Sequence, residues 1–117
     1  MRRDPRSFLW DVREAADAIK QFTQGRSFGD YATDLMLRSA VERQFEIIGE
    51  ALSQLTRVDA VLAARIPELR RIIGFRNALI HGYDQIDDDG VWRTIQTDLP
   101  ALHSQVAGLL AELGDTP

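Results

Sequence analysis

The residues best suited to chemistry in this chain are Arg76 and His81, which lie in one short segment together with Asn77 and Tyr83. A guanidinium binds a phosphate or carboxylate through paired hydrogen bonds, and an imidazole can take up and release a proton near neutral pH. An anion-binding group and an acid–base group therefore stand close together in the sequence. The remaining histidine, His103, has no companion of this kind, and we interpret it as structural.

Arg76 is unusual because helical periodicity places it among apolar residues. At about 100° per residue, the apolar side chains of residues 69–83 form one face, made of Leu69, Ile72, Ile73, Leu79 and Ile80. Arg76 and Tyr83 fall inside this face. A guanidinium there is costly unless a carboxylate, a phosphate or a subunit boundary receives it. Arg76 therefore pairs with Glu46 or Glu50, extends to the surface, or belongs to a binding site.

Small residues recur at every fourth position on the neighbouring helix face, at Gly74, Ala78 and Gly82. His81 lies beside this row, and Asn77 lies one turn before His81. The row is typical of tight packing within a bundle. A second hypothesis is a two-fold dimer, in which the helix meets its own copy and brings Arg76 and His81 of both chains into one cleft. The negative end of the helix dipole would also stabilise a protonated His81.

Helical spacing also predicts the elements that position this segment. The first apolar stripe consists of Phe8, Val12, Ala15, Ile19 and Phe22. Asp4 is expected to cap this helix, with Pro5 at its first position and Gly25 closing it. Ser27 and Asp30 have the spacing of a capping box and predict the start of a long second helix. The stripe of that helix consists of Leu37, Val41, Ile48, Ala51, Leu52 and Leu55.

A third helix is predicted from about Pro67 and Glu68 to about Gly82. The last apolar stripe consists of Val91, Ile95, Leu99, Leu102, Val106, Leu109 and Leu113. Pro100 interrupts it, so we expect a kink there, or a break with Asp98 capping a new helix. The pattern predicts an all-α, antiparallel bundle of four main helices plus short helical turns.

Composition limits the class of protein further. The chain has 117 residues, 44% of them hydrophobic and 27% charged, with a net charge of −4 and no cysteine. These values predict one domain over residues 1–117 and exclude a disulfide scaffold, a zinc knuckle and a thiol nucleophile. No targeting or membrane-spanning segment is evident, so a cytoplasmic location is expected. Lys20 is the only lysine beside 13 arginines; this excess suits nucleic-acid binding, although a GC-rich genome also produces it.

The segment Arg76-Asn77-Ala78-Leu79-Ile80-His81-Gly82-Tyr83 resembles the R-x4-H-x-Y signature of HEPN domains, in their HepT-like toxin branch. Three further segments resemble the same family: Arg43-Gln44-Phe45-Glu46-Ile47-Ile48-Gly49-Glu50-Ala51, Ile72-Ile73-Gly74-Phe75 and Asp98-Leu99-Pro100. The resemblance covers nearly the whole chain in order. It implies a HEPN-like fold and a homodimer in which the motifs of two protomers meet.

The resemblance also implies a function. It implies a metal-independent endoribonuclease, the toxin of a prokaryotic type VII-like toxin–antitoxin pair, with Arg76 and His81 as the catalytic pair and Asn77 in support. The cognate antitoxin would be a small nucleotidyltransferase resembling MntA, which transfers AMP from ATP to Tyr83. Tyr83 is otherwise an aromatic anchor at the end of an apolar stripe.

The residues present suit RNA cleavage without a metal. The 2′-hydroxyl of RNA can attack the adjacent phosphorus. This reaction requires an acid–base group, for which His81 is suited, and a group that stabilises the negative charge of the phosphorane, for which Arg76 is suited. We expect no cofactor and no metal: the run Asp87-Asp88-Asp89 is more typical of a helix start and solvated turn. No glycine-rich phosphate loop is present, so the partner would bind ATP.

Two other functions stay open. In the first, the chain is a non-catalytic HEPN accessory subunit that docks on a nucleotidyltransferase. In the second, it is a merely structural all-α dimer. An acidic net charge opposes binding to RNA. A local basic patch would have to compensate for it, and Arg70, Arg71 and Arg93 are candidates for such a patch.

Overall fold

The chain folds into helices throughout the part that the structure describes, residues 3–81 and 88–114 of a computed structural model. The helices are α1 (Pro5–Thr23), α2 (Phe28–Thr33), α3 (Leu35–Val58), α4 (Ala60–Ala63), α5 (Leu69–His81), α6 (Asp88–Gln96) and α7 (Asp98–Leu113). Strands are absent from these two ranges. The predicted all-α class is therefore confirmed.

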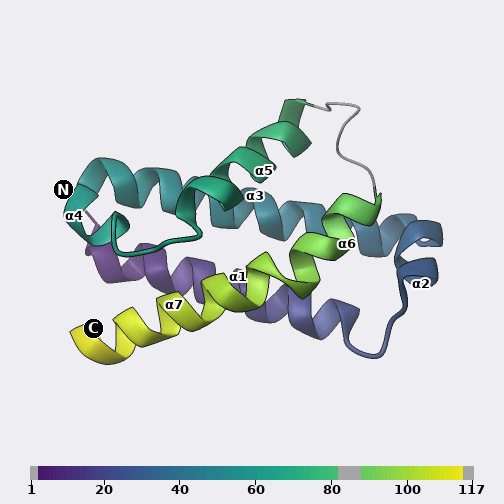
Figure 1. Ribbon diagram of the computed structural model, residues 1–117, viewed down its shortest axis with the longest axis horizontal. Coiled ribbons are helices and arrows are strands. Elements are labelled where there is room, and N and C mark those ends of the chain that lie inside the picture. Colours follow the sequence, from purple (N-terminus) through teal and green to yellow (C-terminus); the bar gives the residue numbers. More distant parts are fainter. Residues whose placement is uncertain (1–2, 82–87, 115–117) are drawn as a thin grey trace.

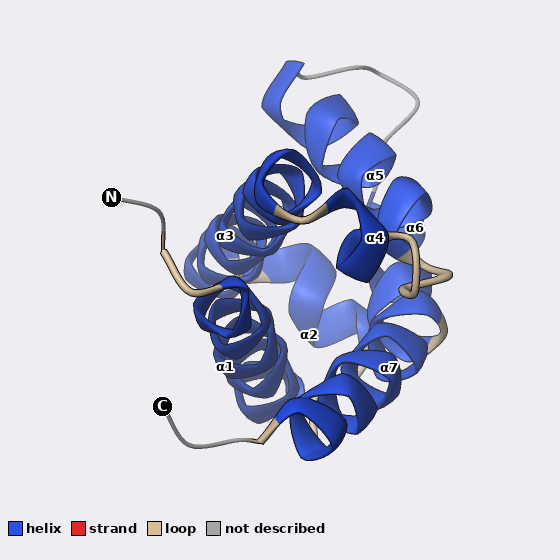
Figure 2. Cartoon of the chain, turned by 90° about the vertical axis from the view of Figure 1, so that its left-hand side faces the viewer, coloured by secondary structure: helices blue, strands red, loops and turns tan. Residues whose placement is uncertain are grey.

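The helices form an antiparallel bundle around α1 and α3. These two helices run side by side in opposite directions, and α7 returns along α1 (Figure 1). The short helices α2 and α6 pack against each other near the end of the bundle where α3 begins. Helix α5 packs on α3, and its C-terminal end projects beyond the bundle in both views (Figures 1 and 2). The end that carries His81 is thus held less closely than the start of the helix.

The apolar stripes predicted from the sequence form the core. The predicted stripe of α3 is buried along its whole length, and Phe45 is buried with it. In α1 the stripe is buried from Phe8 to Ile19, whereas Phe22 is 36% exposed at the end of the helix. Among the described helices, none combines the length and the apolar character needed to cross a membrane.

The predicted helix starts are confirmed at both N-terminal helices. Asp4 accepts a hydrogen bond from the Arg6 amide at 2.9 Å, and Pro5 occupies the first position of α1. Ser27 and Asp30 form the reciprocal bonds of a capping box at the start of α2. Gly25, between these helices, has φ +74°, a left-handed conformation that glycine adopts easily.

The prediction of one continuous helix after Ser27 is wrong. The chain breaks at Asp34, so the capping box opens only the short α2, and the apolar stripe belongs to a new helix, α3. The reason is local. The Asp34 side chain accepts a hydrogen bond from the Leu37 amide at 3.1 Å, which satisfies a free donor at the start of α3 and competes with helix continuation.

The break predicted near Pro100 is confirmed, but the role predicted for Asp98 is wrong. Helix α7 begins at Asp98 itself, and the residue before it, Thr97, makes no side-chain capping bond. The Asp98 carboxylate instead accepts a hydrogen bond from Arg71 of α5 at 3.3 Å. The pairing with Arg71 connects α5 to the start of α7 and neutralises one arginine of the predicted basic patch.

Candidate active site

Helix α5 carries all of the described candidate residues in its second half. Its first half is anchored in the core by Leu69 and Ile72, which are 8% and 0% exposed. Farther along, Ile80 is 46% exposed although the sequence places it on the apolar face. The helix therefore leaves the core between Ile72 and Ile80, and its C-terminal end projects at the edge of the bundle (Figure 1). Arg76, Asn77 and His81 belong to this second half of α5.

The stem of Arg76 is fixed against α3 at Gly49. A Cβ atom added at Gly49 would lie within 2.7 Å of both Cβ and Cδ of Arg76, so any larger residue there would collide with the arginine. Phe45 of α3 and Phe75 of α5 meet edge to face nearby, with ring centroids 5.0 Å apart. The absence of a side chain at Gly49 thus allows the arginine stem to lie directly on α3.

The guanidinium of Arg76 has partners on two helices. Its Nη2 donates to Oε2 of Glu50 at 3.1 Å, and its Nη1 donates to Oδ1 of Asn77 at 3.0 Å. The Arg76 side chain is 20% exposed, and its Nε is buried without a hydrogen-bond acceptor in the described part of the chain. Of the alternatives that the sequence left open for Arg76, the structure shows pairing with a carboxylate of the long helix α3. Glu50 is that residue, because Glu46 pairs with Arg43 at 3.3 Å.

His81 lies on a different side of α5 from Arg76. Five residues of α-helix correspond to a rotation of about 140° and a rise of about 7.5 Å. Asn77 and His81, four residues apart, share one face, and both are exposed. Asn77 therefore lies between the two candidates: it accepts a hydrogen bond from Arg76, and it stands one helical turn before His81. Within one chain, α5 therefore directs Arg76 and His81 to different sides of the helix.

The row of small residues on α5 is open at its start. A Cβ added at Gly74 would meet no described atom within 4 Å, so tight packing among the described helices does not explain this glycine. Ala78 is partly buried. Gly82 and Tyr83, which complete the row and the motif, lie outside the described residues, as does Asp87 of the acidic run.

A cavity of about 450 Å³ opens beside Arg76, between α1, α3 and α5. Three arginines line it, and each pairs with a carboxylate that also lines it: Arg3 with Asp11 at 3.1 Å, Arg43 with Glu46 at 3.3 Å and Arg76 with Glu50 at 3.1 Å. The charges around the cavity are therefore balanced. An incoming phosphate would meet carboxylates as well as arginines there.

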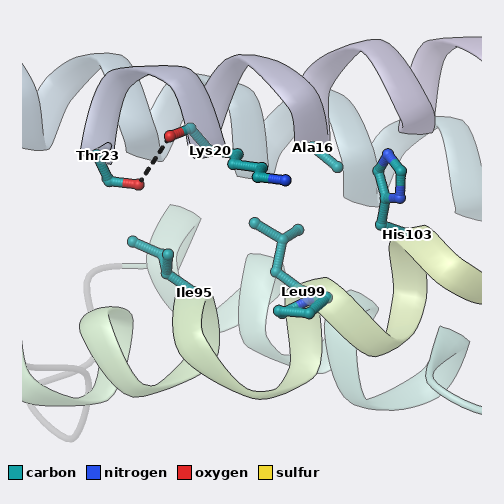
Figure 3. A pocket seen from close by; sticks show the side chains of 7 residues that line it. Ala16, Lys20, Thr23, Ile95, Leu99 and His103 are labelled. Carbon is teal, nitrogen blue, oxygen red and sulfur yellow. Dashed lines mark hydrogen bonds between the residues drawn. The ribbon is translucent and has the colours of Figure 1, made fainter. Parts of the chain in front are cut away.

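The second histidine belongs to a separate cavity. This cavity, of about 290 Å³, lies between α1 and the junction of α6 and α7, where Lys20 and His103 line it (Figure 3). A ring nitrogen of His103 lies 2.8 Å from Oδ1 of Asp17 on α1. The pair links α1 to α7, which agrees with a structural role for His103. Over residues 3–81 and 88–114, no three His, Cys, Asp or Glu side chains are grouped as a metal site would require.

Gly49 is the residue of the site that sequence reasoning missed. It lies in the segment that resembles the HEPN family, but no role was assigned to it. A signal was present, because a glycine in the interior of a long helix costs about 0.5–1 kcal/mol relative to alanine and calls for a packing reason. That reason is the close approach of Arg76.

Comparison with known proteins identifies similar chains over nearly the full length. A family model described as ribonuclease HepT-like matches residues 12–109. A protein named as a probable ribonuclease HepT, from Thermococcus cleftensis, is 35% identical, over 87% of this chain and 92% of its own. A candidate RNase of Methanocaldococcus jannaschii, MJ1380, is 32% identical, over 90% of this chain and 95% of its own. No solved structure is significantly similar.

Proposed function

Because the chain belongs to the HepT-like ribonuclease family, we propose that it is an RNA-cleaving toxin in which Arg76 and His81 carry out the cleavage and Asn77 supports them. The observation that carries the proposal is the arrangement at the end of α5. An arginine is held at the edge of the core by Glu50 and Asn77, and the same helix end presents an exposed histidine.

The proposed reaction uses the nucleophile that RNA itself supplies. The 2′-hydroxyl loses its proton to His81 and attacks the adjacent phosphorus, while the bond from phosphorus to the 5′-oxygen of the next nucleotide breaks. The products are a cyclic phosphate and a 5′-hydroxyl, whose oxygen receives a proton. Arg76 stabilises the added negative charge of the phosphorane. DNA has no 2′-hydroxyl, so the proposal predicts cleavage of RNA alone.

A second copy of the chain would bring the two groups together. Within one chain α5 separates Arg76 and His81 by about 140° around the helix axis. In a two-fold dimer formed along α5, one protomer's His81 can face its partner's Arg76, and two histidines can share the roles of base and acid. The open space at Gly74 and the 46% exposure of Ile80 support this dimer.

Control by an antitoxin is the next part of the proposal. A nucleotidyltransferase partner resembling MntA would transfer AMP to Tyr83, two residues after His81. The attached phosphate would add negative charge where the phosphates of RNA must approach, and it would compete for Arg76. Under this proposal the partner binds ATP.

A non-catalytic docking subunit is the second candidate function. The observation that favours it is the pairing of Arg76 with Glu50, because an arginine with a purely structural role would have the same partner. The net charge of −4 also favours it, since polyanions bind poorly to acidic proteins. The two candidates differ in whether the chain cleaves RNA.

Cleavage assays on matched variants decide between them. We expect Arg76→Ala and His81→Ala to lower the rate of cleavage of a single-stranded RNA by about 100-fold or more. His103→Ala, the matched histidine control on α7, should stay within about threefold of the parent. Expression of the parent chain alone should arrest growth, and His81→Ala should relieve the arrest. Equal cleavage by the parent, Arg76→Ala and His81→Ala would favour the docking subunit.

A further inference from the structure

Glu50 is the only residue of α3 that bonds to the guanidinium of Arg76 in the described part of the chain, and its own carboxylate is held in place. Its Oε1 accepts a hydrogen bond from Nε2 of Gln54 at 2.9 Å, while its Oε2 accepts from Arg76. Both oxygens are therefore occupied. The chain of bonds runs from Gln54 through Glu50 and Arg76 to Asn77, so it joins α3 to α5.

The two bonds to Arg76 fix the plane of its guanidinium. Nη2 is bound to Glu50 and Nη1 to Asn77, and these partners belong to different helices. The stem is fixed separately, because it lies against Gly49. Of these contacts, only the one to Glu50 ties the charged end to α3. Without it, the end of the side chain could turn into the cavity of about 450 Å³ that it lines.

The same geometry leaves a defined edge of Arg76 for an anion. Nε is buried and has no acceptor in the described residues, so a phosphate does not reach it in this conformation. Each Nη carries two hydrogens, and one on each is used by Glu50 or Asn77. The remaining Nη hydrogens stay available for a phosphate at the cavity.

We propose that Glu50 is a positioning residue for Arg76, which holds the guanidinium with its Nη edge toward the bound phosphate. The inference rests on the proposed catalytic role of Arg76. Glu50 acts through Arg76 and touches no reacting atom. Its contribution depends on the hydrogen-bond acceptor that it supplies rather than on its charge, because the charge of a bound carboxylate opposes an incoming phosphate.

Three variants of α3 test this inference in the cleavage assay. Glu50→Ala removes the acceptor and should lower kcat by about tenfold or more while KM changes by less than about threefold. Glu50→Gln retains an acceptor oxygen and should restore kcat to within about threefold of the parent. Glu42→Gln is the matched control, since Glu42 lies about two turns earlier on α3 and is not among the described residues that line the cavity. It should leave both constants unchanged.

A second measurement is independent of cleavage. Hydrogen exchange at the Nε–H of Arg76, followed by NMR and assigned with Arg76→Lys, reports how firmly the buried group is held. Glu50→Ala should raise this exchange rate by about tenfold or more, whereas Glu50→Gln and Glu42→Gln should leave it within about twofold.

The outcomes separate this inference from the proposed function. An unchanged exchange rate in Glu50→Ala, or a Glu50→Gln variant as slow as Glu50→Ala, overturns the positioning role. Cleavage that survives Arg76→Ala overturns the proposed function, and the exchange rates alone then decide whether Glu50 positions Arg76. Thermal unfolding of each variant confirms that a loss of activity does not reflect a loss of fold.

Discussion

The stem of Arg76 lies directly against the backbone of Gly49, so the proposed catalytic arginine is also the point at which α5 is seated on α3. A Cβ atom at Gly49 would come within 2.7 Å of both Cβ and Cδ of Arg76. These atoms lie near the backbone of α5 and cannot move aside as the end of a flexible side chain would. Gly49 therefore matters both for the packing of α5 on α3 and for the position of the proposed catalytic arginine.

Gly49→Ala should destabilise the protein by about 1–3 kcal/mol, because the added methyl group pushes α5 away from α3. It should also lower cleavage, since Arg76 would lose its bond to Glu50. Urea denaturation measures the free energy of unfolding. Gly108→Ala on α7 is the control: its added Cβ meets nothing within 4 Å, and a helical alanine should raise stability by about 0.5–1 kcal/mol. Equal effects of the two substitutions would contradict the seating of Arg76 on Gly49.

Gly74→Leu should weaken self-association and leave the folded chain intact. Gly74 is exposed, and an added Cβ there meets no described atom within 4 Å, so the side chain of a larger residue can extend away from the helix. In a dimer formed along the small residues of α5, the same side chain would separate the two helices. Sedimentation equilibrium should show a dissociation constant raised by about tenfold or more, with Gly108→Leu unchanged. A parent chain that is monomeric at micromolar concentration would exclude the dimer, as would a Gly74→Leu variant that associates like the parent.

Helical periodicity predicted the core well because apolar spacing directly reflects burial. The stripes of α1 and α3 were identified almost completely, and Asp4 and the Ser27–Asp30 pair marked real helix starts. The break at Asp34 was missed because the same apolar period continues across it. Only the side-chain bond from Asp34 to the Leu37 amide distinguishes two helices from one.

The site was less predictable than the core. The sequence left pairing with Glu46 or Glu50 as one of several alternatives for Arg76, and the choice among them depends on side-chain directions that periodicity does not contain. Ile80 was assigned to the apolar face, yet it is 46% exposed, because a helix wheel does not show where α5 leaves the bundle. Pairing of Arg76 with a carboxylate was among the alternatives that the sequence left open, whereas its close contact with Gly49 required the three-dimensional structure.

Tyr83→Phe should abolish modification by the cognate nucleotidyltransferase. Phenylalanine lacks the hydroxyl that would accept AMP, and its ring can still serve as an aromatic anchor. Co-expression of the parent chain with that enzyme should give a product heavier by one AMP group in mass spectrometry, with cleavage suppressed. Tyr83→Phe should keep the unmodified mass and stay active in the same cells. Modification that persists in Tyr83→Phe would place the acceptor elsewhere, and Tyr31, 1% exposed in the core, is the matched tyrosine for comparison.

Acid stability should depend on Glu112 in the direction set by its ion pair. Arg65, before α5, donates two hydrogen bonds to the Glu112 carboxylate at 2.9 and 2.8 Å. These bonds lower the pKa of Glu112 from its ordinary value of 4.5. A carboxyl group whose pKa is lowered by folding stabilises the protein at pH values above its ordinary pKa. This stabilisation is lost as the pH falls through the folded-state pKa. Glu112→Gln should therefore reduce the loss of stability between about pH 7 and about pH 3.

Glu42 gives the control of opposite sign. Burial raises the pKa of Glu42, so its charged form is disfavoured in the folded chain, and its protonation favours the fold as the pH falls. Glu42→Gln should raise the stability of the protein at neutral pH. It should also remove the stabilisation that protonation of Glu42 gives as the pH falls, so the variant should lose more stability on acidification than the parent does. Urea midpoints of the parent and both variants, measured over the same pH range, test the two signs together. A Glu112→Gln variant that loses as much stability on acidification as the parent would contradict the effect of the Arg65 ion pair, and a Glu42→Gln variant that loses less than the parent would contradict the effect of burial at Glu42.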